Sequence, residues 1–108
     1  MDEELTHDPI LTRFRAALDE IYGARLARVV LFGSRARGEA RPDSDYDDVA
    51  VFLKSLPDRW TELDRLADLR VRFIDDTGAF FDATPHPAGS YRDQTPLMYE
   101  IRRDGLDL

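Results

Sequence analysis

The hydrophobic residues in the first third of the chain change their spacing at residue 23. Before it they recur every three or four residues, at Leu11, Phe14, Leu18, Ile21 and Tyr22. This spacing is typical of an amphipathic helix. Asp8 and Pro9 suit its N-cap and first helical position, and Gly23 ends it. Residues 25–32 then form a short apolar run rich in β-branched side chains, which predicts a buried strand ending at Gly33.

The middle of the chain repeats this alternation of strand and helix. Residues 46–53 predict a second strand. Residues 58–72 carry apolar side chains at mixed three- and four-residue spacing, which predicts an amphipathic helix with Trp60 in the core. Residues 79–83 predict a third strand, followed by a loop over residues 84–90 that contains proline and glycine.

The last element is predicted to be another helix. Thr95 and Pro96 begin it, and Gly105 ends it. Its inward-facing residues are expected to be Leu97, Met98 and Ile101. The resulting order is helix, strand, turn, strand, helix, strand, helix. It predicts an α+β fold: a short mixed β-sheet with helices packed mainly on one face, in a single domain spanning residues 1–108.

Charge and composition then narrow the classes of function. The chain has 15 Lys and Arg against 22 Asp and Glu, a net charge of −7, and no cysteine. The acidic balance disfavours direct nucleic-acid binding, although it is compatible with a nucleotide bound through a bridging metal ion. The lack of cysteine excludes disulfides, thiolate zinc sites and thiol nucleophiles. No apolar run is long enough for a membrane span, and the acidic N-terminus lacks a signal peptide's features, so we expect a cytoplasmic protein.

Candidate chemistry is concentrated between the first two predicted strands. Four of the six residues 43–48 are aspartates, and charges packed so closely repel one another. On a strand, Asp45 and Asp47 point to the same face, which Val49 and Val51 continue. Asp48 falls on the opposite face. The pattern therefore predicts two carboxylates side by side at the edge of the buried surface.

These residues suit a nucleoside triphosphate. Asp45 and Asp47 offer the oxygen ligands that Mg²⁺ prefers, and two such ions could activate the attacking oxygen and stabilise the leaving one. Gly33 lets the backbone approach a phosphate closely, and the Ser34 hydroxyl can donate to it. Each pair alone is also explained by turn chemistry. The combination, Gly-Ser followed after ten residues by Asp-x-Asp between two predicted strands, is far more specific.

The same motif resembles a known family. Gly33-Ser34 and Asp45-Tyr46-Asp47 match the signature of the polymerase-β-like nucleotidyltransferases. The string from Gly33 to Gly38, with Ser44 to Asp47, resembles the minimal nucleotidyltransferases (MNT), which are commonly the antitoxins of HEPN/MNT toxin–antitoxin systems. The resemblance covers nearly the whole chain. It implies that Asp45 and Asp47 are metal ligands and that Gly33 and Ser34 hold the triphosphate.

The resemblance also implies a third carboxylate on a later strand. Asp82 is the preferred residue from its strand context, and Asp75 and Asp76 are rivals that look more like a helix-ending turn. Asp48 departs from the family pattern, which usually has an apolar residue there.

The sequence says less about the roles of the basic, aromatic and histidine residues. Arg35 and Arg37 are either phosphate ligands or solvated loop residues. His7 and His86 are expected at the surface. His86 and Tyr91 are placed at the rim of the site, within a segment 84–91 that would contact a partner together with the loop 35–41.

The expected function is transfer of a nucleoside monophosphate, AMP from ATP with Mg²⁺, to a hydroxyl. The resemblance implies a tyrosine of a cognate HEPN toxin as the acceptor. The length of 108 residues supports a protein acceptor, because it leaves no room for a second domain to hold one. One alternative is a non-catalytic antitoxin that acts by binding its toxin. Another is a small-molecule nucleotidyltransferase whose acceptor pocket lies between two copies of the chain.

Overall fold

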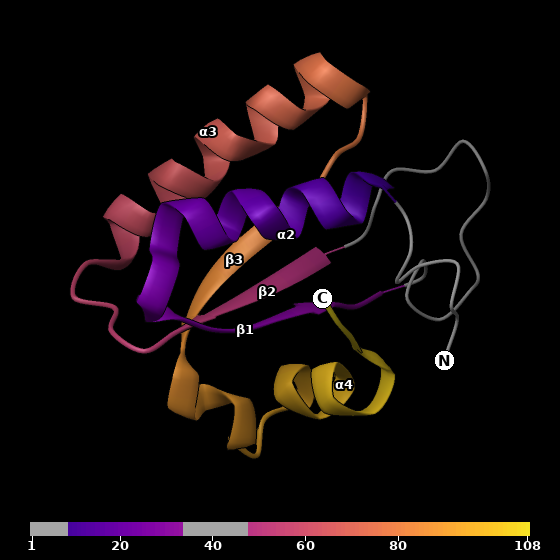
Figure 1. The fold of residues 1–108 in the computed structure, drawn as a ribbon. Helices are drawn as coiled ribbons and strands as arrows, with labels where there is room; N and C mark the ends of the chain where they lie inside the picture. Colours follow the sequence, from indigo (N-terminus) through magenta and orange to yellow (C-terminus); the bar gives the residue numbers. More distant parts are fainter. Residues whose placement is uncertain (1–8, 34–47) are drawn as a thin grey trace.

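The computed structural model describes residues 9–33 and 48–108. Its elements, in chain order, are α2 (Pro9–Tyr22), the 3₁₀ helix η1 (Gly23–Arg25), β1 (Leu26–Leu31), β2 (Asp48–Leu53), α3 (Arg59–Thr77), β3 (Asp82–Pro87), the 3₁₀ helix η2 (Ala88–Arg92), α4 (Pro96–Asp104) and β4 (Leu106–Asp107). Figure 1 shows α2 and α3 on one side of the sheet and α4 on the other. The predicted α+β fold with a mixed sheet is confirmed.

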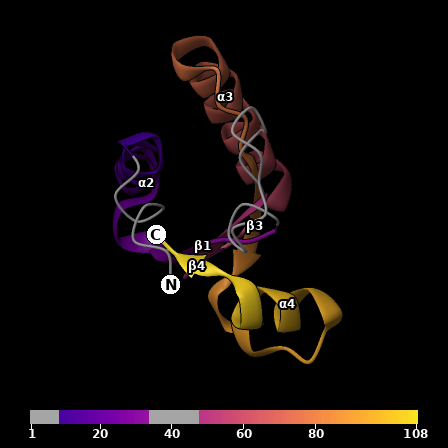
Figure 2. The same ribbon diagram turned by 90° about the vertical axis from the view of Figure 1, so that its right-hand side faces the viewer.

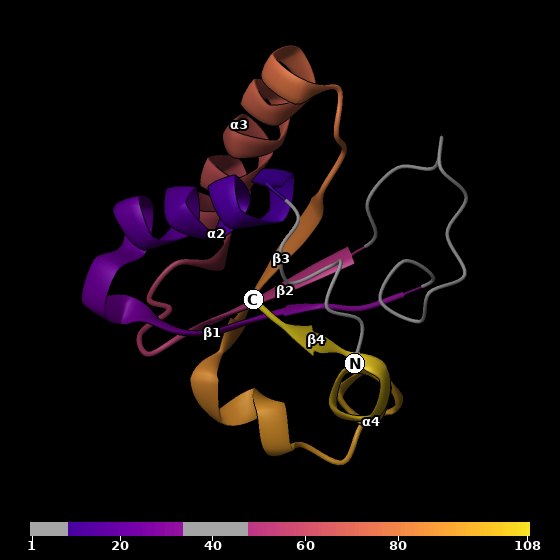
Figure 3. The same ribbon diagram turned by 45° about the vertical axis from the view of Figure 1, so that its right-hand side comes forward.

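The four strands are ordered β3-β2-β1-β4. β2 pairs antiparallel with β1 and parallel with β3, and β4 pairs antiparallel with β1. α3 makes the crossover between the parallel strands β2 and β3, as such a connection requires. Figure 3 shows the short β4 beside β1, directly after α4.

Each face of the sheet has its own core. Val49, Val51 and Leu53 of β2 lie in the larger cluster, which α2 and α3 cover. Ala50 and Phe52 lie in the smaller cluster with Met98 and Ile101 of α4. The side chains of β2 therefore alternate between two buried layers. Figure 2 shows these layers edge-on, with α4 and the segment that leads into it beneath the sheet.

The helix starts confirm their sequence signals. Pro9 is the first residue of α2, which ends at Tyr22. The side chain of Asp58 caps α3 and that of Thr95 caps α4, each accepting a hydrogen bond from a backbone N–H. Gly78, in the left-handed region with φ 75°, ends α3.

Four expectations about the elements and the core are wrong, and one strand was not expected. The third strand runs over Asp82–Pro87 and takes up most of the predicted 84–90 loop. α3 extends five residues past the predicted end at residue 72. Trp60 is not in the core, because 76% of it is exposed, and Leu97 is exposed as well. Strand β4, with only two residues, has no sequence signal of its own and is stabilised by pairing with β1.

No helix within residues 9–33 and 48–108 is both long enough and apolar enough to cross a membrane.

Candidate functional site

The first part of the candidate site is the glycine at the end of β1. Gly33 has a φ of 101°, a conformation that only glycine adopts without strain. Just before it, the Phe32 N–H donates to the Asp48 carbonyl at 2.9 Å, so pairing between β1 and β2 continues up to this point. Gly33 and Asp48 therefore lie side by side at the end of the sheet where β1 finishes and β2 begins. We use the word edge for this line of strand ends.

The parallel register adds a third residue to this edge. Asp82, the first residue of β3, is the Cα partner of Asp48, the first residue of β2. Adjacent strands are about 4.8 Å apart. Both aspartates are exposed, whereas the residues that follow Asp48 are fully buried. Three neighbouring strands thus bring Gly33, Asp48 and Asp82 together where the buried surface ends.

The face on which Asp82 lies follows from its neighbours in β3. Ala83 packs against the larger cluster, on the side of α2 and α3. His86 contacts the ring of Phe52, which belongs to the cluster on the α4 side. Strand alternation therefore places Asp82 on the α4 side. Val49 and Val51 lie on the other side, the one to which the sequence pattern assigns Asp45 and Asp47.

Five candidate residues of the motif lie outside the described residues: Ser34, Arg35, Arg37, Asp45 and Asp47. His7, which was expected at the surface, also lies outside them. What the structure gives is the position of the neighbours of the motif. Ser34 directly follows Gly33, and Asp47 directly precedes Asp48. The two ends of the 34–47 segment are therefore attached to adjacent strands at the same edge as Asp82.

A metal ion requires more ligands than the described part of the site offers. Among residues 9–33 and 48–108, no three acidic or histidine side chains are close enough together to hold one. Asp48 and Asp82 supply hard oxygen atoms in register, which is the chemistry that Mg²⁺ prefers. The donor type at this edge therefore fits the implied ion, while Asp45 and Asp47 would have to complete its ligand set.

Two residues expected at the rim lie elsewhere. His86 is four residues along β3 from Asp82, about 13 Å away at strand spacing. It is half-buried instead of fully at the surface, since it packs on Phe52 and its Nε2 lies 3.0 Å from the Thr84 hydroxyl. Burial, with a smaller effect of Arg59, lowers the pKa of His86. Tyr91 lies in η2, and the guanidinium carbon of Arg28 is 4.0 Å from the centroid of the Tyr91 ring.

The segment 84–91 therefore runs away from the Asp82 edge instead of bordering it. The physical reason is the parallel pairing of β3 with β2, which directs the chain from Asp82 towards the far end of the sheet. The rival carboxylates Asp75 and Asp76 lie in the last turn of α3, as their position before Gly78 predicted.

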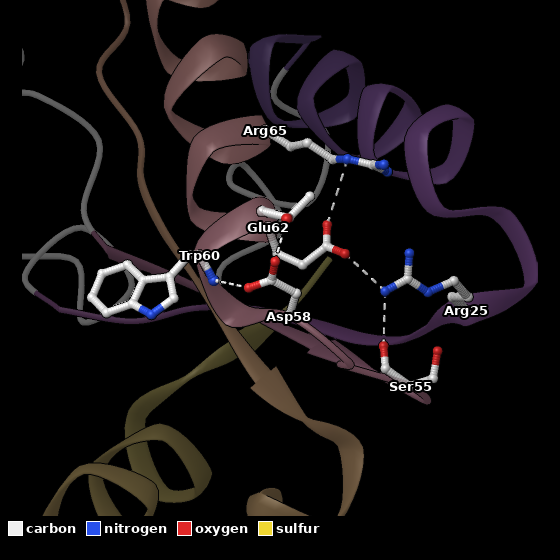
Figure 4. A network of polar contacts seen from close by, with 7 residues as sticks. Arg25, Ser55, Asp58, Trp60, Glu62 and Arg65 are labelled. Carbon is white, nitrogen blue, oxygen red and sulfur yellow. Dashed lines mark hydrogen bonds and ion pairs between the residues drawn. The ribbon is translucent and has the colours of Figure 1, made fainter.

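The opposite end of the sheet carries a different polar cluster, drawn in Figure 4. The buried carboxylate of Glu62 accepts a hydrogen bond from Arg25 at 2.9 Å, and Arg65 lies 3.9 Å from its other oxygen. Arg25 also donates to the Ser55 carbonyl at 2.8 Å. Burial, together with the nearby Glu62, raises the pKa of Tyr22 to about 12. This cluster joins the start of β1 to the β2–α3 connection, and we regard it as structural.

The sequence places Asp48 on the strand face opposite Asp45 and Asp47 and marks it as a departure from the family pattern, but it predicts no role for Asp48 in the site. Its position opposite Asp82 depends on the parallel register of β2 and β3, which no local signal specifies. The strand-initial position of both aspartates is the one feature that could have suggested it.

A mixed four-stranded sheet with two helices on one face, one on the other, and a glycine turn and carboxylates at one edge has the fold of the polymerase-β-like nucleotidyltransferases. The model of the nucleotidyltransferase domain family matches residues 11–86, which include Gly33, Asp48 and Asp82. The chain belongs to this family.

Solved structures show the same fold. A tyrosine-to-alanine mutant of the toxin–antitoxin MntA-HpeT is 22% identical, with a TM-score of 0.54, covering 90% of this chain and 70% of that one. A toxin–antitoxin with AMP-PNP is 21% identical, with a TM-score of 0.55 and coverages of 88% and 69%. MntA-HpeT with two aspartate-to-glutamate changes is 19% identical, with a TM-score of 0.54 and the same coverages. No curated protein matches the chain.

Proposed function

We propose that this chain is the antitoxin of a toxin–antitoxin pair and acts by transferring AMP from ATP to a tyrosine of a HEPN-type toxin. Membership of the nucleotidyltransferase domain family supports the reaction class. The similarity to toxin–antitoxin structures, one of them with AMP-PNP, supports the biological setting and the nucleotide. The observation that carries the proposal is the meeting of Gly33, Asp48 and Asp82 at one edge of the sheet.

The proposed roles follow the chemistry of each residue. Asp45 and Asp47, with Asp82 as the third carboxylate, would hold Mg²⁺, which supplies charge neutralisation for the triphosphate. Gly33 and Ser34 would bind the phosphates through backbone N–H groups and the hydroxyl. Arg35 and Arg37 would add guanidinium donors to the same groups.

Ser34 is proposed as a phosphate ligand and not as a nucleophile. Within the described residues, His86 is directed to Phe52 and Thr84, about 13 Å along the strand from Asp82. It is therefore not placed to activate a hydroxyl at this edge.

A specific observation favours a second candidate function. Asp82 lies on the α4 side of the sheet, whereas the sequence pattern assigns Asp45 and Asp47 to the side of Val49. If the three carboxylates do not converge on one ion, transfer is lost. The chain would then neutralise its toxin by binding alone.

One experiment separates the two functions. The purified chain is incubated with the protein encoded by the adjacent gene, ATP and Mg²⁺, and the partner is weighed by mass spectrometry. A gain of one AMP, absent with Asp47→Asn, supports the enzyme. A stoichiometric complex that neutralises the toxin with no gain in mass supports the binding antitoxin. If neither a gain in mass nor a complex is found, both candidates are wrong for that partner.

A further inference from the structure

The tyrosines that the structure describes differ in how accessible they are. Tyr22 belongs to the larger cluster, and only 4% of it is exposed. Tyr91 is half-buried, since its ring lies edge-on to Phe52 and against the guanidinium of Arg28. Tyr99 of α4, in contrast, is 59% exposed. Of these three tyrosines, Tyr99 is therefore the one that another molecule can reach.

Helix α4 holds Tyr99 on the side that faces away from the sheet. Met98 and Ile101 are the buried residues of this helix and pack on the sheet. Tyr99 and Arg103 are one turn apart on the other side of the helix, and both are exposed. Figures 1 and 2 show α4 at the periphery of the fold, across the sheet from α2 and α3. A second molecule can therefore approach Tyr99 without displacing any described element.

An open groove of about 430 Å³ runs past Tyr99 along α4. It is lined by residues 94–96 and by Tyr99, Glu100, Arg102 and Arg103. Its volume is within the range of ~300–1,000 Å³ that is typical of small-molecule sites. The guanidinium carbon of Arg103 is 5.6 Å from the centroid of the Tyr99 ring. Since guanidinium groups are good partners of phosphate oxygens, a phosphodiester on Tyr99 would have donors beside it.

The charge of this groove does not by itself select a ligand. Glu100 lines the groove as well, and Arg103 pairs with Asp104 at 3.0 Å. What singles out Tyr99 is the accessibility of its phenol. Its hydroxyl has no hydrogen-bond partner among the residues that the structure describes, so it is available as an acceptor.

We propose that Tyr99 is itself an acceptor of AMP and is modified by the candidate site of a second copy of this chain. The inference rests on the proposed function, because it uses the same transfer of AMP from ATP to a tyrosine. The Tyr99 Oη forms a bond to the α-phosphorus of ATP. The bond from that phosphorus to the oxygen that bridges to the β-phosphate breaks, pyrophosphate leaves, and the phenol proton passes to solvent.

A second copy is required because a chain does not bring Tyr99 to its own site. The attacking oxygen must come within about 3–3.5 Å of the phosphorus. The body of α4, about 10–12 Å across with its side chains, lies between the Tyr99 ring and the sheet. None of Gly33, Asp48 and Asp82 lines the groove beside Tyr99. Two chains with a net charge of −7 each repel one another, so the encounter is brief, which suffices for a transfer.

The test mixes two versions of the full chain with ATP and Mg²⁺. The donor carries Tyr99→Phe and keeps its candidate site intact. The acceptor carries Asp47→Asn, which removes a proposed metal ligand, keeps Tyr99, and is labelled with a heavy nitrogen isotope so that the two masses differ. We expect the acceptor to gain one AMP, which peptide mass spectrometry maps to Tyr99, and the donor to gain none.

Two further acceptors test the assignment to Tyr99. In the Asp47→Asn chain, adding Tyr99→Phe should abolish the gain in mass. Adding Tyr91→Phe should leave the gain unchanged, because Tyr91 is half-buried against Arg28 and Phe52. Circular dichroism melts check that every version is folded.

The donor is incubated in parallel with the protein encoded by the adjacent gene, which separates this inference from the proposed function. AMP on that protein but not on the acceptor chain would overturn the inference and leave the proposed function standing. AMP on neither would overturn both. A gain by the acceptor without any donor, or at a residue other than Tyr99, would also overturn the inference. AMP on Tyr99 alone would support it and contradict the proposed toxin acceptor.

Discussion

The two ends of the sheet use carboxylates in opposite ways. At one end, Glu62 is 3% exposed and is held by Arg25 and Arg65. At the other, Asp48 and Asp82 are exposed and lie opposite each other in register. Like charges directly opposite each other on neighbouring strands destabilise a sheet.

The comparison separates a buried carboxylate that is paired with arginines from two exposed carboxylates that lie opposite each other. Glu62 joins the start of β1 to the β2–α3 connection through Arg25. Asp48 and Asp82 instead lie exposed and opposite each other with the same charge, an arrangement that the proposed cation would stabilise. The following predictions test this difference, starting with the largest effect.

Asp82→Asn is expected to reduce nucleotide transfer at least 100-fold. It removes a proposed metal ligand, and a metal ion supplies several kcal/mol of charge stabilisation. The melting temperature should stay the same or rise, because repulsion with Asp48 is relieved. Transfer is measured by the mass of the partner, and complex formation by pull-down.

Asp76→Asn is the matched control, since Asp76 is an exposed carboxylate in the last turn of α3. It should leave both transfer and stability unchanged. Undiminished transfer with Asp82→Asn would remove Asp82 from the site, and loss of the complex would make it a docking residue.

Glu62→Ala is expected to lower the free energy of unfolding without lowering the rate of transfer. It leaves Arg25 without its buried partner, and we expect the free energy of unfolding to fall by about 2–3 kcal/mol. Transfer per folded molecule should be unchanged at a temperature where the variant is folded. Urea denaturation measures the loss, with the exposed Glu20→Ala as control. Equal stability of the two variants would show that the Glu62 cluster is not structural.

Gly33→Ala tests the turn that begins the candidate site. Its φ of 101° is strained for alanine, so we expect a loss of about 1–2 kcal/mol together with weaker nucleotide binding. Gly89→Ala is the control, because Gly89 has no positive φ and an added Cβ there meets nothing within 4 Å. If Gly33→Ala behaves like Gly89→Ala in denaturation and in nucleotide titration, the turn has no special role.

The smallest effect concerns pH. Burial raises the pKa of Tyr22 to about 12 from the ordinary 10.0, so the neutral phenol is favoured in the folded chain. The contribution of Tyr22 to the free energy of unfolding is therefore complete below pH 10 and is lost as the pH rises from 10 towards 12. Tyr22→Phe should therefore show a flatter loss of stability over that range. Thermal melts at a series of pH values measure this. If the melting temperatures of Tyr22→Phe and the original chain fall equally steeply with pH, the prediction is contradicted.

Local signals predicted most of the fold. Pro9, Asp58 and Thr95 mark helix starts, and Gly23 and Gly105 mark helix ends, because caps act through the residues next to them. β4 could not be predicted, since two residues form a strand only through pairing with β1. Trp60 was misplaced because apolar spacing alone does not show that α3 has a second apolar side.

The sequence predicts which residue types make up the candidate site, but it does not predict the register that brings Asp48 and Asp82 together. The motif from Gly33 to Asp47 indicates a nucleotide site by chemistry and spacing. The pairing of Asp82 with Asp48 depends on where α3 returns the chain, which is a tertiary property. For the same reason the segment 84–91, expected at the rim of the site, runs away from it.

The most direct test of the central claim is a crystal structure of the chain with AMP-PNP and Mn²⁺, with the metal located by anomalous scattering. The account predicts a metal peak bound by Asp45, Asp47 and Asp82, with the triphosphate on Gly33 and Ser34. A metal held without Asp82, or a nucleotide bound away from this edge of the sheet, would contradict it.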